Sequence, residues 1–486
     1  MPLAVLAACL LAPATTGCAG DEAAVDRERL RARILEAGVP LDPTVGRPIA
    51  SIEDPVAQLG RDLFFTKALG GDYDTACASC HHPVLGGGDG LSLSIGVHAL
   101  HPDVLGPGRV HRPGWPGYDG GPTVPRNAPT TFNLALWDRV LFHDGRVESL
   151  GKHEGAHGIG PEGIRTPDVP FGSADPNAGL TLAAAQARFP VTSPEEMRGF
   201  DFEAGADREA ARVHLACRIG DYGIGADELG NPRWESRFRA AFDLPTAPVE
   251  EVVDFAHVAE AIARYESSQI FVDSPFHRFV RGDDDALTEA EARGAWLFFT
   301  PRSEGGAGCA DCHDGPLLSD ESFHVLAVPQ IGRGKGDGLD GRHDFGRARE
   351  TGIGADQFAF RTPSLLNVAV TGPYGHDGAY ESLEAMVRHH LDPAAALATY
   401  EDELPTQPGI QTDGWRARTE TILERVEVFP LELSDDEVDD LLAFLEALTD
   451  PCVTDRACLA PWIPDPEAPD PDGFRLVALD ADGEPL

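Results

Sequence analysis

The sequence is poor in basic side chains relative to acidic ones. Among its 486 residues, 39 are Lys or Arg and 80 are Asp or Glu, which gives a formal net charge of −41 at pH 7. This shortage of cations excludes a nucleic-acid binder of the usual basic kind, because phosphates would be repelled. The composition, 42% hydrophobic and 24% charged, is typical of a globular protein, and the length allows two or three domains.

Long apolar runs are also missing, apart from one short stretch near the start. Residues 3–12 are apolar but fewer than the roughly 20 that cross a bilayer. They are typical of a signal-peptide core, and residues 16–18 form a lipobox-like ending. We therefore predict a signal or lipoprotein segment at residues 1–24, with Cys18 as a candidate lipid anchor. The alternative is a cleaved secretory signal with an incidental Cys, since no Lys or Arg precedes Arg27.

Runs of alternating apolar and polar residues, which indicate half-buried strands, are absent as well. Helical patterns occur instead. Residues 252–270 show apolar positions at 3.6-residue spacing. Ser434 and Glu437 form a capping box before a helix with one apolar face. The sequence therefore predicts a mainly α fold.

Four of the nine cysteines belong to two C-x-x-C-H motifs, at residues 77–81 and 309–313. This spacing is the signature of covalent c-type haem attachment: two thiols about one helical turn apart bond both vinyl groups of a porphyrin, and the following His ligates the iron. We predict two covalent haems, which also fits export to the periplasm. The predicted haem-binding residues are Cys77, Cys80 and His81 in the first motif, and Cys309, Cys312 and His313 in the second.

Two other chemistries use paired cysteines. A four-Cys zinc site would need its halves closer together than the 229 positions between Cys80 and Cys309, and it would not require a His after each pair. A thioredoxin-like redox motif would occur once, in a βαβ setting that the sequence does not show. Both explain less of the pattern than haem attachment does.

The two halves of the chain repeat more than the cysteine motif. Similar segments precede each motif, at residues 60–65 and 293–299, and an HDG triplet follows each. The interval from the motif His to the HDG His is 62 residues in the first half and 63 in the second. The repeat predicts two tandem cytochrome c-like domains, each binding one c-type haem, at residues 25–247 and 248–460. The helix at 252–270 would open the second domain.

Segments outside the repeat are rich in Gly, Pro or Asp. Loops of this kind lie at residues 99–125, 151–180 and 332–354, and long loops in compact domains are usually functional or mobile. The Pro- and Asp-rich tail at residues 461–486 is expected to have little order.

Besides the four motif cysteines, three cysteines follow the predicted signal segment. Cys452 and Cys458 are six positions apart, which favours a local disulfide in an oxidising compartment. Cys217 is interpreted as a buried small hydrophobic residue.

Together, these motifs resemble those of the bacterial di-haem cytochrome c peroxidase and MauG superfamily. The similarity extends over roughly residues 45–450, interrupted by the three loops. Besides the two haem motifs, it is carried by RNAPT (126–130), FHDGR (142–146), Gln186 with PEEM (194–197), SPF (274–276), FRTPSL (360–365) and PYGHDG (373–378).

The resemblance implies that the haem on His81 is the peroxide site, with Gln186 and Glu196 as catalytic residues. Glu196 suits this role because cleavage of the O–O bond requires a proton to move between the two oxygens, and such acid–base help is worth ~10²–10⁴-fold. Gln186 would orient the peroxide. The alternative for Glu196 is a carboxylate at a helix start, favourable to the helix dipole without any catalysis.

The resemblance also implies that the haem on His313 receives electrons and is six-coordinate. Relatives carry a Met or a Tyr fourteen residues after the HDG His. This chain has His390 there, with His389 as a rival. A pair of His ligands would give a lower potential than His with Met, since axial ligands move haem potentials over a range of about 0.8 V.

A calcium ion between the domains is a further feature of the family. It is bound by an Asn side chain and two backbone carbonyls, which correspond here to Asn127, Thr371 and Pro373. Hard oxygen ligands of this kind suit Ca²⁺.

The chain departs from the family pattern in three places. Peroxidases that need reductive activation carry a His directly after Ser-Ile-Gly, whereas here Val97 follows and His98 comes one position late. We therefore expect the peroxide haem to be five-coordinate or water-bound at rest, and active without prior reduction. His143 replaces the Trp that relatives place between the haems, and the insertion between Arg146 and Gln186 is expected to cover a haem edge.

The resulting hypothesis is a di-haem cytochrome c peroxidase that reduces hydrogen peroxide to water with electrons from a small periplasmic c-type cytochrome or cupredoxin. The negative charge favours a basic partner. The alternatives are a MauG-type di-haem oxidase acting on a protein or organic substrate, and a di-haem electron carrier without peroxide chemistry. The sequence leaves the donor, the haem potentials and the oligomeric state open, a homodimer included.

Overall fold

The computed structural model describes residues 24–115, 117–230 and 232–486. Cys18 and the rest of the predicted signal segment up to residue 23 lie outside these residues. Within the described part of the chain, no helix combines the length and the apolar character needed to cross a membrane.

The fold is mainly α with little sheet, as the sequence predicts. Strands β1, β2 and β3 form one antiparallel sheet in that order, and β4 pairs with β5. The strands are β1 (Val140–Leu141), β2 (Val147–Ser149), β3 (Ile164–Arg165), β4 (Phe323–His324) and β5 (Phe360–Arg361). The helices are α1 (Arg27–Glu36), α2 (Pro55–Phe64), α3 (Leu182–Gln186), α4 (Arg208–Gly220), α5 (Trp234–Ala241), α6 (Val249–Val252), α7 (Phe255–Ser267), α8 (Pro275–Val280), α9 (Glu289–Phe299), α10 (Ala348–Thr351), α11 (Leu383–Leu391), α12 (Pro393–Thr399), α13 (Trp415–Glu420), α14 (Asp435–Glu446) and α15 (Arg456–Leu459).

Each half of the molecule is built around one pair of closely crossing helices. In the first half α2 packs on α7, and a Cβ atom on Gly60 would lie 1.8 Å from the Ala261 carbonyl oxygen. In the second half α9 packs on α14, and a Cβ on Gly294 would lie 1.8 Å from the Asp440 carbonyl oxygen. Both glycines belong to the repeated segments, so the same close backbone contact is made within each half.

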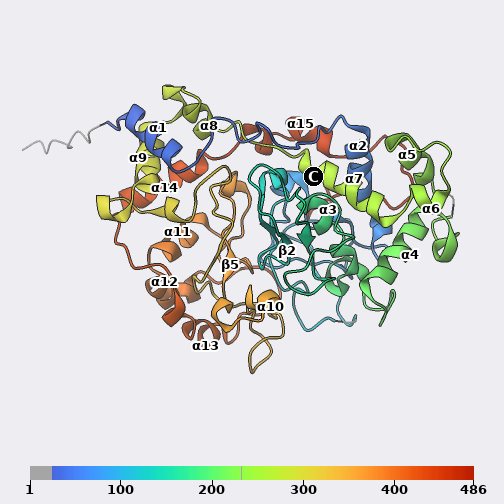
Figure 1. Cartoon of the computed structure of the whole chain (residues 1–486). Helices are drawn as coiled ribbons and strands as arrows, with labels where there is room; N and C mark the ends of the chain where they lie inside the picture. The colour runs from blue at the N-terminus through green and yellow to red at the C-terminus, as the bar shows by residue number, and fades with distance from the viewer. Residues whose placement is uncertain (1–23, 116, 231) are drawn as a thin grey trace, which may run out of the picture.

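Two apolar cores surround these helix pairs. The core of the first half contains Phe64 and Tyr265, and that of the second contains Phe298 and Phe444. Figure 1 shows the two halves side by side, with α9, α11 and α14 in one and α2, α4 and α7 in the other. The sequence analysis assigns residues 252–270 to the second domain, whereas α7 shares the first core. This packing favours a domain boundary after α7, and the division at residue 247 stays a prediction.

Both ends of the described chain cross to the opposite half. α1 contacts α8 and α9, and its Leu30 and Ile34 are buried in the second core. The tail returns to the first half (Figure 1). There the Leu476 N–H donates to the Phe65 carbonyl at 2.8 Å, and Leu476 is buried in the first core. The expectation of little order in residues 461–486 is therefore wrong, because backbone hydrogen bonds and buried apolar side chains hold this segment in place.

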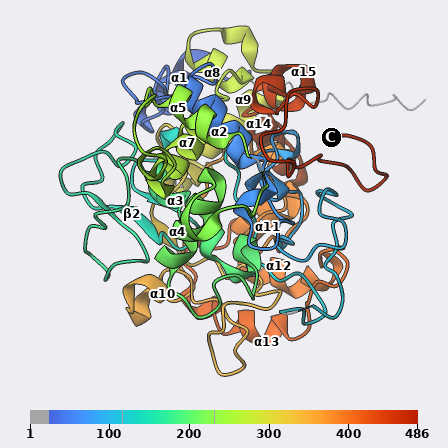
Figure 2. The same cartoon turned by 90° about the vertical axis from the view of Figure 1, so that its right-hand side faces the viewer.

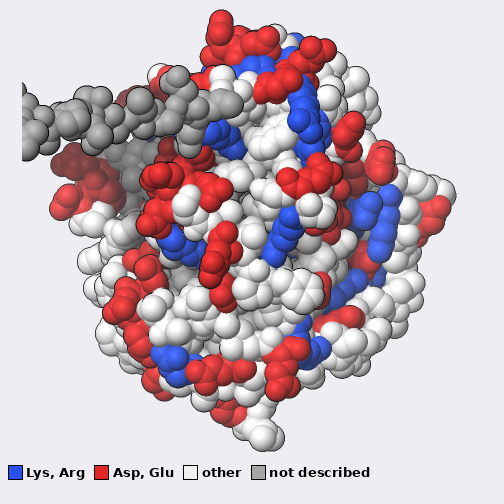
Figure 3. All heavy atoms as spheres, turned by 90° about the vertical axis from the view of Figure 1, so that its left-hand side faces the viewer, with Lys and Arg blue, Asp and Glu red and all other residues white. Residues whose placement is uncertain are grey.

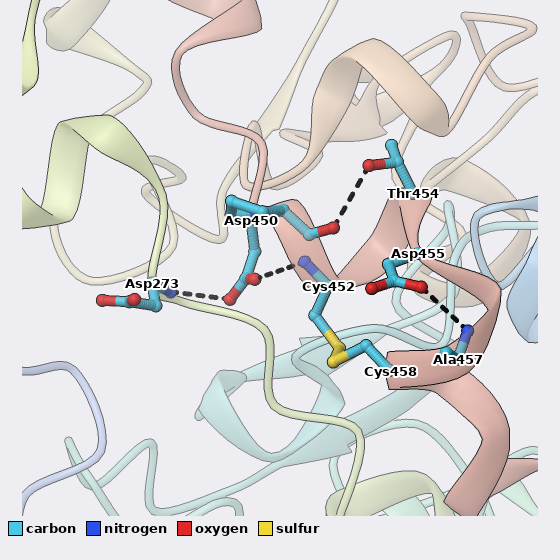
Figure 4. Close-up of a disulfide and its surroundings, with 8 residues drawn as sticks. Asp273, Asp450, Cys452, Thr454, Asp455, Ala457 and Cys458 are labelled. Atoms are coloured by element: carbon cyan, nitrogen blue, oxygen red, sulfur yellow. Dashed lines mark hydrogen bonds between the residues drawn. A yellow bond between two sulfur atoms is a disulfide. The ribbon is translucent and has the colours of Figure 1, made fainter.

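The predicted disulfide between Cys452 and Cys458 is confirmed and lies just after α14 (Figure 4). The Asp450 carboxylate beside it accepts hydrogen bonds from the Cys452 N–H at 2.9 Å and the Asp273 N–H at 2.7 Å. This corner therefore joins the end of α14 to the segment before α8. Cys217 on α4 is a buried free thiol, as expected.

The loop at residues 332–354 extends from the second half onto the first. Asp344 accepts hydrogen bonds from the Arg126 guanidinium at 2.6 and 2.9 Å. Arg347 pairs with Glu148 at 2.6 Å, and all four side chains are buried. Buried ion pairs therefore fix this loop between the halves.

The loop at residues 151–180 projects beside α3 and α4 (Figure 2). Its base is fixed by Asp138, whose carboxylate accepts the backbone N–H groups of Gly155 at 2.8 Å and His157 at 2.9 Å. Arg47 also pairs with Asp138 at 2.9 Å, which neutralises this buried charge.

Candidate functional site

One continuous cavity brings the two C-x-x-C-H motifs together. Its walls contain both cysteines and the His of each motif, which come from opposite halves of the fold. The other predicted site residues on its walls are Gln186, Glu196, His390, Asn127, Thr371 and Pro373. The structure therefore gathers the whole predicted set around one space, except for the rival ligand His389.

Each motif has the same local structure. A short 3-10 helix, Cys77–Ser79 in the first half and Cys309–Asp311 in the second, follows the Gly-containing helix of its pair. The His81 N–H donates to the Cys77 carbonyl at 3.1 Å, and the His313 N–H donates to the Cys309 carbonyl at 2.9 Å. This turn sets the two thiols and the His of each motif in a fixed relation.

The two motif histidines are oriented for metal binding. The His81 Nδ1 lies 3.2 Å from the Gly87 carbonyl, and the His313 Nδ1 lies 2.9 Å from the Leu318 carbonyl. A ring that donates from Nδ1 to a carbonyl keeps the lone pair of Nε2 for a metal. Burial lowers the pKa of both rings, that of His313 to about 4, so both are neutral.

The zinc alternative finds no support in this geometry. Among the described residues, the only group of three or more His, Cys, Asp or Glu within metal-binding distance is Cys312, Asp320 and His324. The four motif cysteines therefore do not converge on one ion. None of them pairs in a disulfide.

The two candidate axial histidines on α11 have different surroundings. His389 is fully buried with both ring nitrogens occupied, Nδ1 by the Tyr380 hydroxyl and Nε2 by the Leu326 carbonyl, each at 2.8 Å. His390 uses only Nδ1, which lies 2.9 Å from the Met386 carbonyl, and its ring lines the cavity. These contacts favour His390 as a ligand and give His389 a structural role.

The residues on these walls fit two c-type haems. Metal–imidazole bonds are about 2 Å long, so two rings on opposite sides of one metal ion have centroids roughly 6 Å apart. The centroids of the His313 and His390 rings are 6.3 Å apart. Beside the first motif, the Gln186 side-chain oxygen is buried and has no hydrogen-bond partner among the described residues, as expected for a group that faces a bound molecule.

Glu196 lies in a π-helical turn, Pro194–Arg198, whose first residues follow the Ser193 cap. Its N–H donates to the Ser193 hydroxyl at 3.4 Å, so the helix-start interpretation describes its backbone correctly. The residue also lines the cavity, with the Arg146 guanidinium 3.9 Å from its carboxylate. Burial raises the pKa of Glu196, and the cations Arg146 and Lys335 oppose this effect.

The predicted calcium ligands all line the cavity. The Asn127 amide nitrogen donates to the Leu91 carbonyl at 3.0 Å, which leaves its side-chain oxygen as an acceptor. Thr371 and Pro373 come from the second half, so a cation bound by all three residues would join the halves.

Two histidines singled out by their departure from the family pattern lie in different places. His98 is not among the residues that line the cavity; its Nε2 pairs with Asp72 at 2.9 Å and its ring lies beside Trp115. His143 lines the cavity and its Nε2 lies 3.1 Å from the Asn127 carbonyl. Burial, together with Arg126, lowers the pKa of His143 to about 4, so it is a neutral ring.

Sequence reasoning missed two cations of the peroxide side, Arg146 and Lys335. Arg146 belongs to the FHDGR motif, which marks its place in the family pattern but does not indicate a role for it. Lys335 comes from the Gly-rich loop of the other half, and nothing in its local sequence indicates that it lines this cavity.

Comparisons with known proteins agree with this site. The family model described as di-haem cytochrome c peroxidase matches residues 54–285. The cytochrome-c peroxidase IdrP1 of Denitromonas iodatirespirans is 30% identical over 442 residues, covering 86% of this chain and 88% of that protein. The methylamine utilization protein MauG of Methylorubrum extorquens is 28% identical over 457 residues, covering 92% and 95%.

Solved structures share the fold. A MauG-like protein associated with microbial copper homeostasis superimposes with a TM-score of 0.55 at 22% identity, covering 87% of this chain and 98% of its own. The diheme peroxidase BthA from Burkholderia thailandensis gives a TM-score of 0.52 at 23% identity, covering 89% and 92%.

The fold and the cavity define a class of helical redox proteins in which two haem-attachment motifs face one shared space. The chain belongs to the di-haem cytochrome c peroxidase family. This family includes both cytochrome c peroxidases and MauG-type oxidases, and its members are oxidoreductases. Membership implies two haem c groups, in agreement with the two motifs.

Proposed function

We propose that this protein is a cytochrome c peroxidase that reduces hydrogen peroxide to water. The observation that carries the proposal is that Gln186 and Glu196 line the cavity that both haem motifs share, with Glu196 close enough to Cys77 and Cys80 to interact electrostatically with both sulfurs. A carrier without chemistry would need neither a buried amide oxygen lacking a partner among the described residues nor a carboxylate on this cavity wall.

The haem held by Cys77, Cys80 and His81 would supply the iron that binds peroxide, and the haem on the second motif would supply electrons. The overall change is H₂O₂ with two electrons and two protons giving two H₂O. Glu196 would accept a proton from one peroxide oxygen and deliver it to the other, which leaves as water when the O–O bond breaks. Gln186 orients the peroxide by hydrogen bonding, and Arg146 stabilises negative charge during the transfer.

We propose that His313 and His390 would both hold the iron of the second haem. The 6.3 Å ring separation supports this, as do the Nε2 atoms, which no hydrogen bond among the described residues engages. Six-coordination would keep peroxide away from this centre. On the peroxide side, the hydrogen bond of His98 to Asp72 supports a first haem that is five-coordinate or water-bound at rest and active without prior reduction.

Calcium at Asn127, Thr371 and Pro373 is proposed as a structural ion between the halves. The free side-chain oxygen of Asn127 and the shared cavity wall support it. Oxygen donors of this type suit a hard divalent cation.

The electron donor is proposed to be a small periplasmic c-type cytochrome or cupredoxin with a basic face. Acidic side chains are spread over the face that carries the second half, with basic ones between them (Figure 3), and the whole chain has a net charge of −41. Complementary charge would speed the encounter and make it sensitive to salt. Periplasmic location, attachment through Cys18 and a homodimer remain predictions.

A MauG-type activity is the second candidate, because the match to MauG of Methylorubrum extorquens spans 95% of that protein. Stopped-flow mixing of the oxidised protein with peroxide, followed by a reduced small cytochrome, separates the candidates. A peroxidase changes haem absorbance at once and then oxidises the cytochrome rapidly. A MauG-type oxidase would keep the altered absorbance and oxidise cytochrome poorly, and an electron carrier would not react with peroxide.

The Glu196→Gln variant tests the assigned chemistry. It should slow the peroxide reaction by ~10²–10⁴-fold while both haems stay attached. Glu154→Gln, on the exposed loop, is the matched control and should react like the native protein. A native rate in Glu196→Gln would contradict the proposal.

A further inference from the structure

A second, more polar cleft opens on the surface and meets the central cavity. Its walls come from three loops and include Asp119, Thr123, Arg333 and Gln411. Arg333 donates to the Thr123 carbonyl at 3.1 Å, and the Gln411 amide donates to Asp119 at 2.8 Å, so these loops are bonded to one another. The cleft therefore has a fixed rim.

Lys335 and Pro125 line both spaces, the outer cleft and the central cavity. Lys335 thus lies at the point where the cleft meets the cavity, and Glu195, the residue before Glu196, lines the same cleft. Lys335 belongs to the second half of the chain, whereas Glu196 belongs to the first.

The backbone around Lys335 is held in place from both sides. Its N–H donates to the His343 carbonyl at 3.0 Å, and its carbonyl accepts from the Arg349 guanidinium at 2.9 Å. Gly334 before it has a φ of +63°, and a Cβ there would lie 2.1 Å from the Arg342 carbonyl oxygen. The loop therefore presents Lys335 at a defined position.

The charges that face Lys335 come from both halves. They include the cations Arg126 and Arg146 and the carboxylates Asp344, Glu196 and Asp144. Glu195, Arg342 and Arg349 line the same cleft as Lys335. Among the described residues, no hydrogen bond or ion pair engages the Lys335 ammonium directly. Burial, with Arg126 and Arg146, lowers its pKa to about 8, so it is still charged at neutral pH.

Glu196 is faced by three cations, Arg146, Lys335 and Arg126, and by one further acid, Glu195. Asp344 and Asp144 are already paired with Arg126, at 2.6 and 2.5 Å. Arg126 is thus largely neutralised, and Arg146 lies 3.6 Å from Asp144 as well as 3.9 Å from Glu196. Among the described cations that face Glu196, Lys335 is therefore the one that no ion pair engages.

We propose that Lys335 is a positioning residue for the peroxide reaction: from the mouth of the cavity it keeps the Glu196 carboxylate ionised, ready to accept a proton. The proposal rests on the proposed function of Glu196. It also means that the peroxide side of one half is complete only when the loop of the other half is in place.

Replacing Lys335 by Met removes the charge with a side chain of similar length, and Lys335→Arg is the charge-preserving control. We measure the rate of the peroxide reaction by stopped flow from pH 4 to 9. Loss of the cation favours protonated Glu196, so the acid side of the profile should move to higher pH by about half a unit or more in Lys335→Met. It should stay in place in Lys335→Arg. Above about pH 8 native and Met proteins should converge, because Lys335 itself loses its charge there.

A second readout does not depend on turnover. The infrared carboxyl band that disappears in Glu196→Gln reports the protonation of Glu196 in the resting protein. In Lys335→Met this band should persist to higher pH than in the native protein. Lys335→Gln serves in its place if the Met variant does not fold with both haems.

The outcomes separate this inference from the proposed function. If Glu196→Gln reacts at the native rate, the role of Glu196 fails and the inference falls with it. If Glu196→Gln is slow while the pH profile and the infrared midpoint of Lys335→Met equal those of the native protein, the inference alone is overturned.

Discussion

The imidazole rings of His313 and His390 face each other with their centroids 6.3 Å apart and their planes inclined by 59°. His313 follows the second cysteine pair, and His390 lies 77 positions later near the end of α11. The ring of the neighbouring His389 instead makes hydrogen bonds with the Tyr380 hydroxyl and the Leu326 carbonyl. Two adjacent residues on one helix thus have separable roles.

Removal of each histidine should therefore give a different result. His390→Ala should open the sixth position of the second haem, so that its spectrum changes from low-spin to high-spin. His390→Met should keep a low-spin spectrum and raise the potential. His389→Ala should leave the spectrum unchanged and cost about 1–3 kcal/mol of stability, because the Tyr380 hydroxyl loses its buried partner. A high-spin spectrum in His389→Ala instead would reverse the assignment.

The glycines at the two helix crossings, Gly60 and Gly294, are expected to be sensitive to substitution. Gly60→Ala and Gly294→Ala each place a Cβ 1.8 Å from a backbone oxygen, so each helix must shift, at a cost of about 1–3 kcal/mol or more. Denaturant unfolding measures this loss. Gly354→Ala is the control, since its added Cβ meets nothing within 4 Å. If all three variants were equally stable, the helix crossings would have room for a Cβ atom, which would contradict the close contacts described above.

The buried pair of Arg126 and Asp344 makes the contact between the halves dependent on pH. Burial alone would raise the pKa of Asp344, but Arg126 holds it well below its usual range. Its stabilising contribution is therefore fully present above the unfolded pKa of about 3.9, and it is lost as pH falls below that value.

Asp344→Asn should cost about 3 kcal/mol at pH 7, because it leaves a buried cation short of a partner. The difference from the native protein should shrink as the pH is lowered toward 3. Urea unfolding of both proteins across this range measures it, with the exposed Asp402→Asn as control. A difference that stays constant with pH would contradict the ionised state of Asp344.

The resting state of the first haem follows from the position of His98. Because Asp72 holds this side chain outside the cavity walls, one haem should be high-spin in the oxidised protein, and peroxide should react without prior reduction. The electronic spectrum and the initial rate of the oxidised and half-reduced forms check this. Low-spin spectra at both haems, with activity only after reduction, would show that another residue occupies the position.

The site could be predicted from the sequence motifs more completely than the domain architecture could. Cys77 and Cys309 could be identified from the fixed spacing of the haem motifs, and Glu196 from the family resemblance. The fold then brings all three residues to one cavity. The half to which α7 belongs could not be predicted, because its apolar spacing shows that it packs on a core but not on which one. Lys335 lines the same cavity as Glu196 because Asp344 and Arg126 fix its loop, and such long-range placement leaves no local pattern.

The central claim, that two haems are bonded to the chain, can be tested by the intact mass of the mature protein made in a host that attaches haem c. The account predicts the mass of the polypeptide plus two haem groups, and of the polypeptide plus one when both Cys309 and Cys312 are replaced by Ala. A native protein with the mass of the bare polypeptide would contradict it.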